Sequence, residues 1–162
     1  MAHTKASRRI RQRGNAMLEG ALALPPLLML LFATIDFSVA ILVKNTVQSA
    51  VREGVRYAVT GQTVSGLGED ESIRTVVENN SLGFLNSSNG DSLISITYYN
   101  PNTLAVVTGV GSNASGNIVE VQVSGFSWAW MVPYGRDATP AQISAISMDI
   151  VEPNSSGVPP PR

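Results

Sequence analysis

The chain has 162 residues, 44% of them hydrophobic and none of them cysteine, which excludes a disulfide framework, a thiolate metal site and a cysteine nucleophile. Its length allows one modest domain beside any anchor segment. The formal net charge of −1 conceals an asymmetry, because residues 1–14 hold five basic residues and no acid, whereas the rest holds six basic and twelve acidic residues.

The first 14 residues form a basic leader that ends in Gly14. No aromatic residue lies among its arginines and no fold signature accompanies them, so the leader indicates topology or targeting and not nucleic-acid binding. A single carboxylate, Glu19, follows five residues after Gly14 at the start of an apolar segment. Because a carboxylate at the edge of lipid costs free energy, we expect Glu19 to serve a purpose. The plainer alternative is an interfacial residue that reaches back to water.

Residues 20–43 are predicted to form a membrane-spanning helix. At ~1.5 Å per residue this segment extends ~36 Å, enough for a hydrocarbon core of ~30 Å. The basic residues precede the segment and only Lys44 closely follows it, so we expect a cytoplasmic amino terminus and an exported remainder. The one charge inside the segment, Asp36, either pairs with another subunit or lies close enough to the outer membrane face to be hydrated.

Two prolines, Pro25 and Pro26, lie inside the apolar run. Proline lacks a backbone donor and crowds the preceding turn, so a kink or a locally melted turn is expected over residues 22–26. A plain anchor tolerates such a break, and a subunit that leaves the bilayer could use it, so the prolines do not distinguish the two.

A cleaved secretory signal is the main alternative to an anchor. Such a signal needs a basic start, an apolar centre of about 7–15 residues and a small-x-small cleavage site, which Ser38-Val39-Ala40 could supply. The apolar run is longer than that centre, and the helical pattern continues past Ala40. These two features favour an anchor.

The helix is predicted to continue beyond the membrane. Apolar residues recur at spacings of three and four from Val43 to Ala58, and Gly61 offers a stop signal. An unbroken helix over residues 15–59 would be ~67 Å long. Its second half is expected to pack on the exported domain.

The exported domain, residues 61–152, is predicted to be α+β. A short helix is expected over residues 72–79, entered through acidic residues that favour the positive end of the helix dipole and whose spacing does not fit a calcium loop. A turn is expected at Asn89-Gly90. Apolar alternation then predicts an antiparallel sheet with one packed face and one wet face, covered by the long helix. The alternating sets are Ile94, Ile96 and Tyr98; residues 104–107; Val119, Val121 and Val123; Phe126, Trp128 and Trp130; and Ile146, Met148 and Ile150.

No residue pattern in the exported domain predicts catalysis. The only histidine, His3, lies in the leader, so neither a Ser-His-Asp arrangement nor a histidine metal cluster can form in the domain. Residues 109–116 are expected to be a flexible connection without a phosphate-binding fingerprint. Trp128 and Trp130 could bind a surface or a sugar, but we interpret them as ordinary core and rim residues. The proline-rich residues 153–162 are expected to be a disordered tail.

The run Gly14-Asn15-Ala16-Met17-Leu18-Glu19 resembles a class III signal, the kind cut by prepilin peptidases in type IV pilins and pseudopilins. Three further runs are similar to the TadE-like family of minor pseudopilins in tight-adherence (Flp) pilus systems: Glu19-Gly20-Ala21-Leu22-Ala23-Leu24-Pro25, Ile35-Asp36-Phe37 and Arg52-Glu53-Gly54-Val55-Arg56-Tyr57-Ala58. The resemblance covers about a third of the chain. It departs from the family pattern at Gly20, where an aromatic is frequent, and at Ser38, where glycine is more usual.

The resemblance implies a pilin-like fold and cleavage by a prepilin peptidase between Gly14 and Asn15 on the cytoplasmic side. It also implies that Glu19 neutralises the amino terminus of a neighbouring subunit, and it leaves Asp36 as a second candidate for subunit assembly. The implied partners are the peptidase, other pilins or pseudopilins, the pilus assembly platform and membrane lipid, with no nucleic acid, cofactor or metal.

The expected protein is a non-enzymatic, single-pass protein of a bacterial inner membrane, with its carboxy-terminal domain in the periplasm or at the cell surface, or in a pilus. One alternative is an unprocessed single-span anchor that carries a binding domain. A second is a secreted binding module cut after Ala40.

Overall fold

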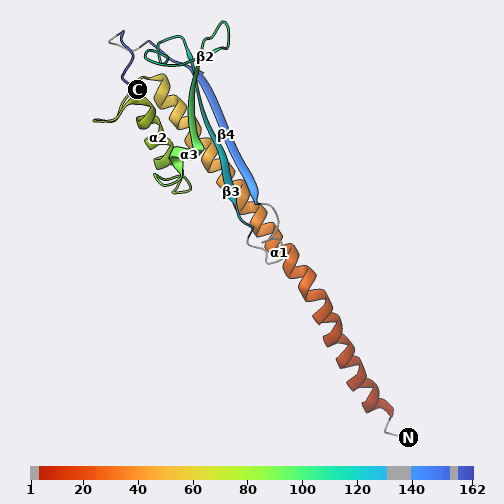
Figure 1. Cartoon of the computed structure of the whole chain (residues 1–162). Helices are drawn as coiled ribbons and strands as arrows, with labels where there is room; N and C mark the ends of the chain where they lie inside the picture. Colours follow the sequence, from red (N-terminus) through yellow and green to blue (C-terminus); the bar gives the residue numbers. More distant parts are fainter. Residues whose placement is uncertain (1–3, 131–139, 154–156) are drawn as a thin grey trace. The chain divides into compact units, whose positions relative to one another are not determined.

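The computed structural model describes residues 4–130, 140–153 and 157–162, with side chains described from residue 16 onward. The elements, shown in Figure 1, are α1 Thr4–Val59, α2 Glu69–Asn80, α3 Gly90–Leu93, β1 Ile94–Tyr99, β2 Val106–Val107, β3 Ile118–Trp128 and β4 Ala141–Ile150. The described residues divide into two compact units. The anchor unit contains α1 up to Val39, and the sheet unit contains α1 from Ala40 together with α2, α3 and the sheet.

Helix α1 begins at Thr4, before the predicted start at Asn15, and continues through Pro25 and Pro26. The prediction of a locally melted turn over residues 22–26 was therefore wrong. Two adjacent prolines remove only two backbone donors, and the hydrogen bonds of the flanking turns maintain the helical path. The helix ends where expected, since Gly61 takes a left-handed φ of 59° and donates its amide to the Ala58 carbonyl at 3.1 Å.

The sheet is antiparallel throughout, in the order β2-β1-β3-β4. Figure 1 shows its long strands alongside the part of α1 that belongs to the sheet unit. The inner face of the sheet and the facing side of α1 form one apolar core, which confirms the predicted α+β fold and its helical cover. Its fully buried members are Val43, Val47, Ala50 and Val51 from α1 and Val119, Val121 and Val123 from β3.

The alternation on β4 is opposite to the expected one. Ile146, Met148 and Ile150 are 47–54% exposed, whereas Ile143 and Ala145 are buried. The β3–β4 register pairs these three exposed residues with Gln122, Glu120 and Ile118, which alternate with the core residues Val119, Val121 and Val123 along β3. Helix α1 lies close to this edge strand, since Gln48 donates its side-chain amide to the Ile146 carbonyl at 3.0 Å.

Helix α2 begins at Glu69, three residues before the predicted start, so the acidic residues form its first turn. Its buried side includes Ile73 and Val77, as predicted, while Val76 is only half-buried. The chain turns over residues 87–89, close to the predicted turn, and passes directly into the short helix α3 at Gly90, with Asn89 at its amino-terminal cap.

Trp128 ends β3 and makes an edge-to-face contact with Phe84, with ring centroids 6.5 Å apart. This contact supports the interpretation of Trp128 as a packing residue. Trp130 lies beyond the end of the strand. The regular alternation predicted across this region is interrupted by a register shift between Val123 and Phe126.

Two segments predicted to be loose are attached to the sheet unit. In the connection over residues 109–116, Ser112 and Asn113 are buried. In the tail, the Pro161 carbonyl accepts a hydrogen bond from the Glu69 amide at 2.8 Å, so the prediction of disorder was wrong for the last residues. Specific polar contacts hold this segment despite its low content of large apolar side chains. Residues 154–156 of the predicted tail lie outside the described residues.

Candidate processing and assembly site

The first part of α1 has the composition and length of a membrane span. Within the described range Ala16–Val59, the most apolar window has a mean hydropathy of 2.3. Two hydroxyls in this region are paired within the helix: Thr34 Oγ1 donates to the Leu30 carbonyl and Ser38 Oγ to the Thr34 carbonyl, both at 2.7 Å. Such pairing suits hydrocarbon, where no water is present to satisfy a hydroxyl.

The predicted processing residues, Gly14 and Asn15, lie within α1. Their side-chain surroundings fall outside the described part of the chain. The structure therefore gives their place in the helix and leaves cleavage as a prediction.

Glu19 lies on an exposed part of α1. Its neighbours Met17, Leu18 and Leu22 are also exposed in the single chain, so the carboxylate belongs to a largely apolar surface. In lipid, an ionised carboxylate on this surface needs a cationic partner or a route to water. The geometry thus fits the predicted role of Glu19 in contacting another subunit without testing it.

Asp36 is placed differently from Glu19. It is only 2% exposed, although Ile35 and Phe37 on either side are exposed, and it has an interaction partner within the chain. The two roles predicted for Asp36, pairing with another subunit and hydration near the outer membrane face, stay predictions. The structure does not bring Asp36 and Glu19 together: they are 17 positions apart on one helix, ~25 Å along its axis.

The run over residues 52–58 is the contact segment between α1 and α2. A Cβ atom built on Gly54 would overlap Cγ2 of Val77, so the absence of a side chain permits the close approach of the two helices. Val55 and Ala58 are buried on the same part of α1. Glu53 and Arg56 form an exposed ion pair at 3.8 Å, which contributes little to stability.

Residues 14–56 match the family model described as TadE-like protein. Over these 43 of its 162 residues the chain is similar to TadE-like proteins. The TadE-like segment begins at Gly14, the predicted scissile glycine, and ends at Arg56, within the contact segment between α1 and α2. No curated protein and no solved structure matches the chain.

The TadE-like segment contributes residues to both units of the molecule. Its first part supplies the exposed apolar surface of the anchor unit, and its last part supplies Val43, Val47, Ala50, Val51 and Val55 to the core of the sheet unit. One continuous helix therefore joins a surface suited to lipid or to other subunits with the core of a folded domain.

A polar cluster that was not predicted from the sequence lies at the start of α2. It consists of Glu69, Asp70, Tyr98, Asn113 and Arg162. Arg162 donates from Nη2 and Nε to Oδ2 of Asp70 at 2.6 and 3.0 Å, and its guanidinium carbon lies 4.8 Å from the centroid of the Tyr98 ring. The Tyr98 hydroxyl donates to Oδ1 of Asp70 at 3.2 Å. The hydrogen bonds to Asp70 raise the pKa of Arg162 above its usual value, so the cation is fixed.

Glu69 is the buried acid of the polar cluster. It is fully buried and accepts a hydrogen bond from Nδ2 of Asn113 on Oε2, while Oε1 has no hydrogen-bond partner among the described residues. Burial raises the pKa of Glu69 to about 6, against the opposing effect of the Asn113 hydrogen bond. Burial likewise raises the pKa of the Tyr98 hydroxyl, which therefore remains a neutral donor.

The acidic run at residues 69–71 and the distant Arg162 were the only signals for the polar cluster in the sequence. Their pairing depends on the return of the chain from β4, which local patterns do not reveal. Among the described residues there is no group of three or more His, Cys, Asp or Glu side chains placed to hold a metal ion. The cluster is thus an acid–arginine contact within the sheet unit.

Proposed function

We propose that the protein is a minor pseudopilin of a tight-adherence (Flp-type) pilus or a related secretion filament, and that it acts by assembly and not by catalysis. The observation that carries this proposal is the TadE-like match, which begins at Gly14 and follows α1 into the core of the sheet unit. A helix with these two environments can hold a folded domain to a membrane and later pack beside other pilin helices.

In this proposal a prepilin peptidase cuts between Gly14 and Asn15 on the cytoplasmic side of a bacterial inner membrane. The cut removes all five basic residues of the leader and leaves a free amine on Asn15. Glu19 then neutralises the amine of a neighbouring subunit, since an ionised carboxylate in an apolar interface needs a cation.

The proposed topology keeps the amino terminus in the cytoplasm and exports the sheet unit. The distribution of basic residues supports it, because five of them precede the span and only Lys44 closely follows it. Asp36 is proposed as a second residue of subunit assembly.

The test of this proposal uses the source bacterium with its pilus system intact. Glu19→Ala is compared with Glu53→Ala, which removes an exposed acid from the same helix. We expect Glu19→Ala to be processed and present in the membrane but to lower the number of surface pili at least tenfold by electron microscopy. Glu53→Ala should leave pili unchanged. Normal piliation with Glu19→Ala would overturn the proposed role of Glu19.

Replacement of Gly14 tests the cleavage site separately. A bulky side chain in Gly14→Leu should block the peptidase, so the full-length form should accumulate on immunoblots of membranes. Gly20→Leu is the matched control, because it adds the same side chain to the same helix where a Cβ meets nothing within 4 Å. Unchanged processing of Gly14→Leu would exclude Gly14–Asn15 as the scissile bond.

A further inference from the structure

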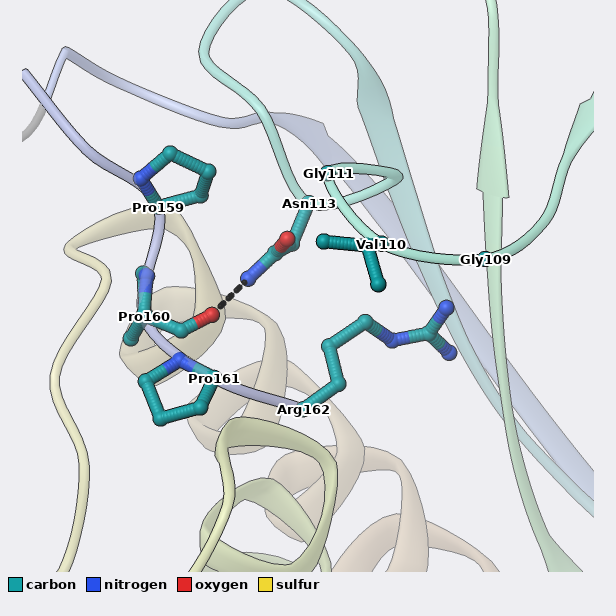
Figure 2. A pocket seen from close by; sticks show the side chains of 8 residues that line it. All are labelled: Gly109, Val110, Gly111, Asn113, Pro159, Pro160, Pro161 and Arg162. Atoms are coloured by element: carbon teal, nitrogen blue, oxygen red, sulfur yellow. Dashed lines mark hydrogen bonds between the residues drawn. The ribbon is translucent and has the colours of Figure 1, made fainter.

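Hydrogen bonds from the sheet unit to main-chain carbonyls hold the last residues, 160–162. Nδ2 of Asn113 donates to the Pro160 carbonyl at 2.9 Å, and the Glu69 amide donates to the Pro161 carbonyl at 2.8 Å. Figure 2 shows the Asn113 side chain pointing at Pro160 across a hollow. Paired donors to successive carbonyls suit a proline-rich segment, whose carbonyls have no partners within the segment itself.

The arginine of this segment has its own binding position. Asp70 accepts from two of its nitrogens, Tyr98 lies under the guanidinium, and Ser112 Oγ is within hydrogen-bond reach of Nη1. The Arg162 side chain is 28% exposed, so the charge is partly desolvated where it meets Asp70. Charge-assisted contacts in such a setting give both affinity and selectivity for arginine.

The surface is shaped to let the backbone of the segment approach closely. A Cβ atom on Gly68 would lie 2.6 Å from the main-chain carbon of Arg162, which is too close for any side chain. On the other side, residues 109–111 complete a hollow of about 570 Å³ that Pro159, Pro160 and Pro161 line. The fit therefore involves carbonyls, guanidinium and backbone contour together.

We propose that Gly68, Glu69, Asp70, Tyr98 and Asn113 form a recognition site for a Pro-Pro-Arg segment, which the chain's own tail fills here and which the tail of a second copy fills when copies assemble. Every contact described above is made by atoms of the segment itself. The covalent connection to β4 therefore sets only the effective concentration of the tail, and not the contacts that recognise it. Use of the site between copies rests on the proposed assembly role, whereas the recognition itself does not.

The binding test uses full chains purified in detergent and an acetylated, amidated, fluorescent peptide, Val-Pro-Pro-Pro-Arg. A chain lacking residues 159–162 should bind the peptide, and the intact chain should bind it at least tenfold more weakly because its own tail competes. Full-length Arg162→Ala provides a second open receptor if the shortened chain does not fold.

Four changes should each weaken this binding at least tenfold. One is alanine in place of the peptide arginine, and the other three are Asp70→Asn, Asn113→Ala and Gly68→Ala in the receptor. Glu53→Gln, an exposed acid on α1, should leave it unchanged. No binding to a receptor that retains native circular dichroism, or equal binding by Asp70→Asn, would overturn the recognition site.

Exchange between copies is tested by mixing two variants. A shortened chain has an empty site, and an Asp70→Asn chain has a tail that its own site no longer holds. We expect these two to co-elute from a size-exclusion column and to separate when the free peptide is added in excess. Peptide binding without co-elution would retain the site but overturn its use between copies, whatever the outcome of the processing experiments.

Discussion

Among single residues, Glu69 links the stability of the sheet unit to pH. The folded chain favours its protonated form, because burial raises its pKa from the ordinary 4.5 to about 6. A raised carboxyl pKa lowers stability as pH rises from about 4.5 through 6, since the folded state then loses a proton that it binds more tightly than the unfolded state. The full cost, on the order of 2 kcal/mol, is present well above pH 6, where the folded carboxyl is also ionised.

Glu69→Gln should therefore stabilise the protein at pH 7.5. The glutamine carbonyl can still accept from Asn113, and the substitution removes the buried charge at the expense of a buried amide group. We expect a gain of about 1–2 kcal/mol in the free energy of unfolding by urea denaturation at pH 7.5, and little difference at pH 4. Glu53→Gln should show no such dependence on pH. A Glu69→Gln protein that is less stable at pH 7.5 would show that the charge is favourable where it lies.

At the scale of elements, the closest contact is the approach of α1 to α2 at Gly54. Gly54→Ala gains helix propensity of about 1 kcal/mol but forces Val77 and its helix to move, which costs about 1–3 kcal/mol. We expect net destabilisation of the sheet unit, measured as a lower urea midpoint. Gly20→Ala lies in open space on the same helix and should not lower this midpoint. Equal midpoints for the two variants would contradict the close approach.

The orientation of β4 provides a second test at this scale. Ile146→Thr changes an exposed side chain and should alter stability by no more than about 0.5 kcal/mol, whereas Val121→Thr buries a hydroxyl in the core and should cost about 1–3 kcal/mol. Thermal melts of the two variants distinguish the observed face from the predicted one. A larger loss for Ile146→Thr would place Ile146 in the core.

The elements that were predicted correctly have strong local periodicity. The long helix repeats apolar residues at three and four positions, and β3 alternates around Val121, so both were evident without the structure. On β4 the same reasoning was misleading, because periodicity gives two faces and does not say which of them α1 covers. The tail and Asp70 were missed for another reason: their contact joins residues 92 positions apart.

At the scale of the whole molecule, the segment similar to TadE-like proteins lies in α1, which contributes both an exposed apolar surface and residues of the domain core. The candidate processing and assembly residues could be identified from the sequence, because they lie within one linear motif. It was insufficient for their environment: the burial of Asp36 depends on the fold of the chain. The proposed pseudopilin role therefore depends most on whether the leader is removed.

The intact mass of the protein tests this most directly, in cells that contain a prepilin peptidase and in cells that lack it. We expect a mature form that begins at Asn15 when the peptidase is present, and the full-length form when it is absent. A form that begins at Met1 or Ala2 in both cells would contradict processing and favour an unprocessed anchor. A form that begins at Ile41 in both would instead identify a secreted module cut after Ala40.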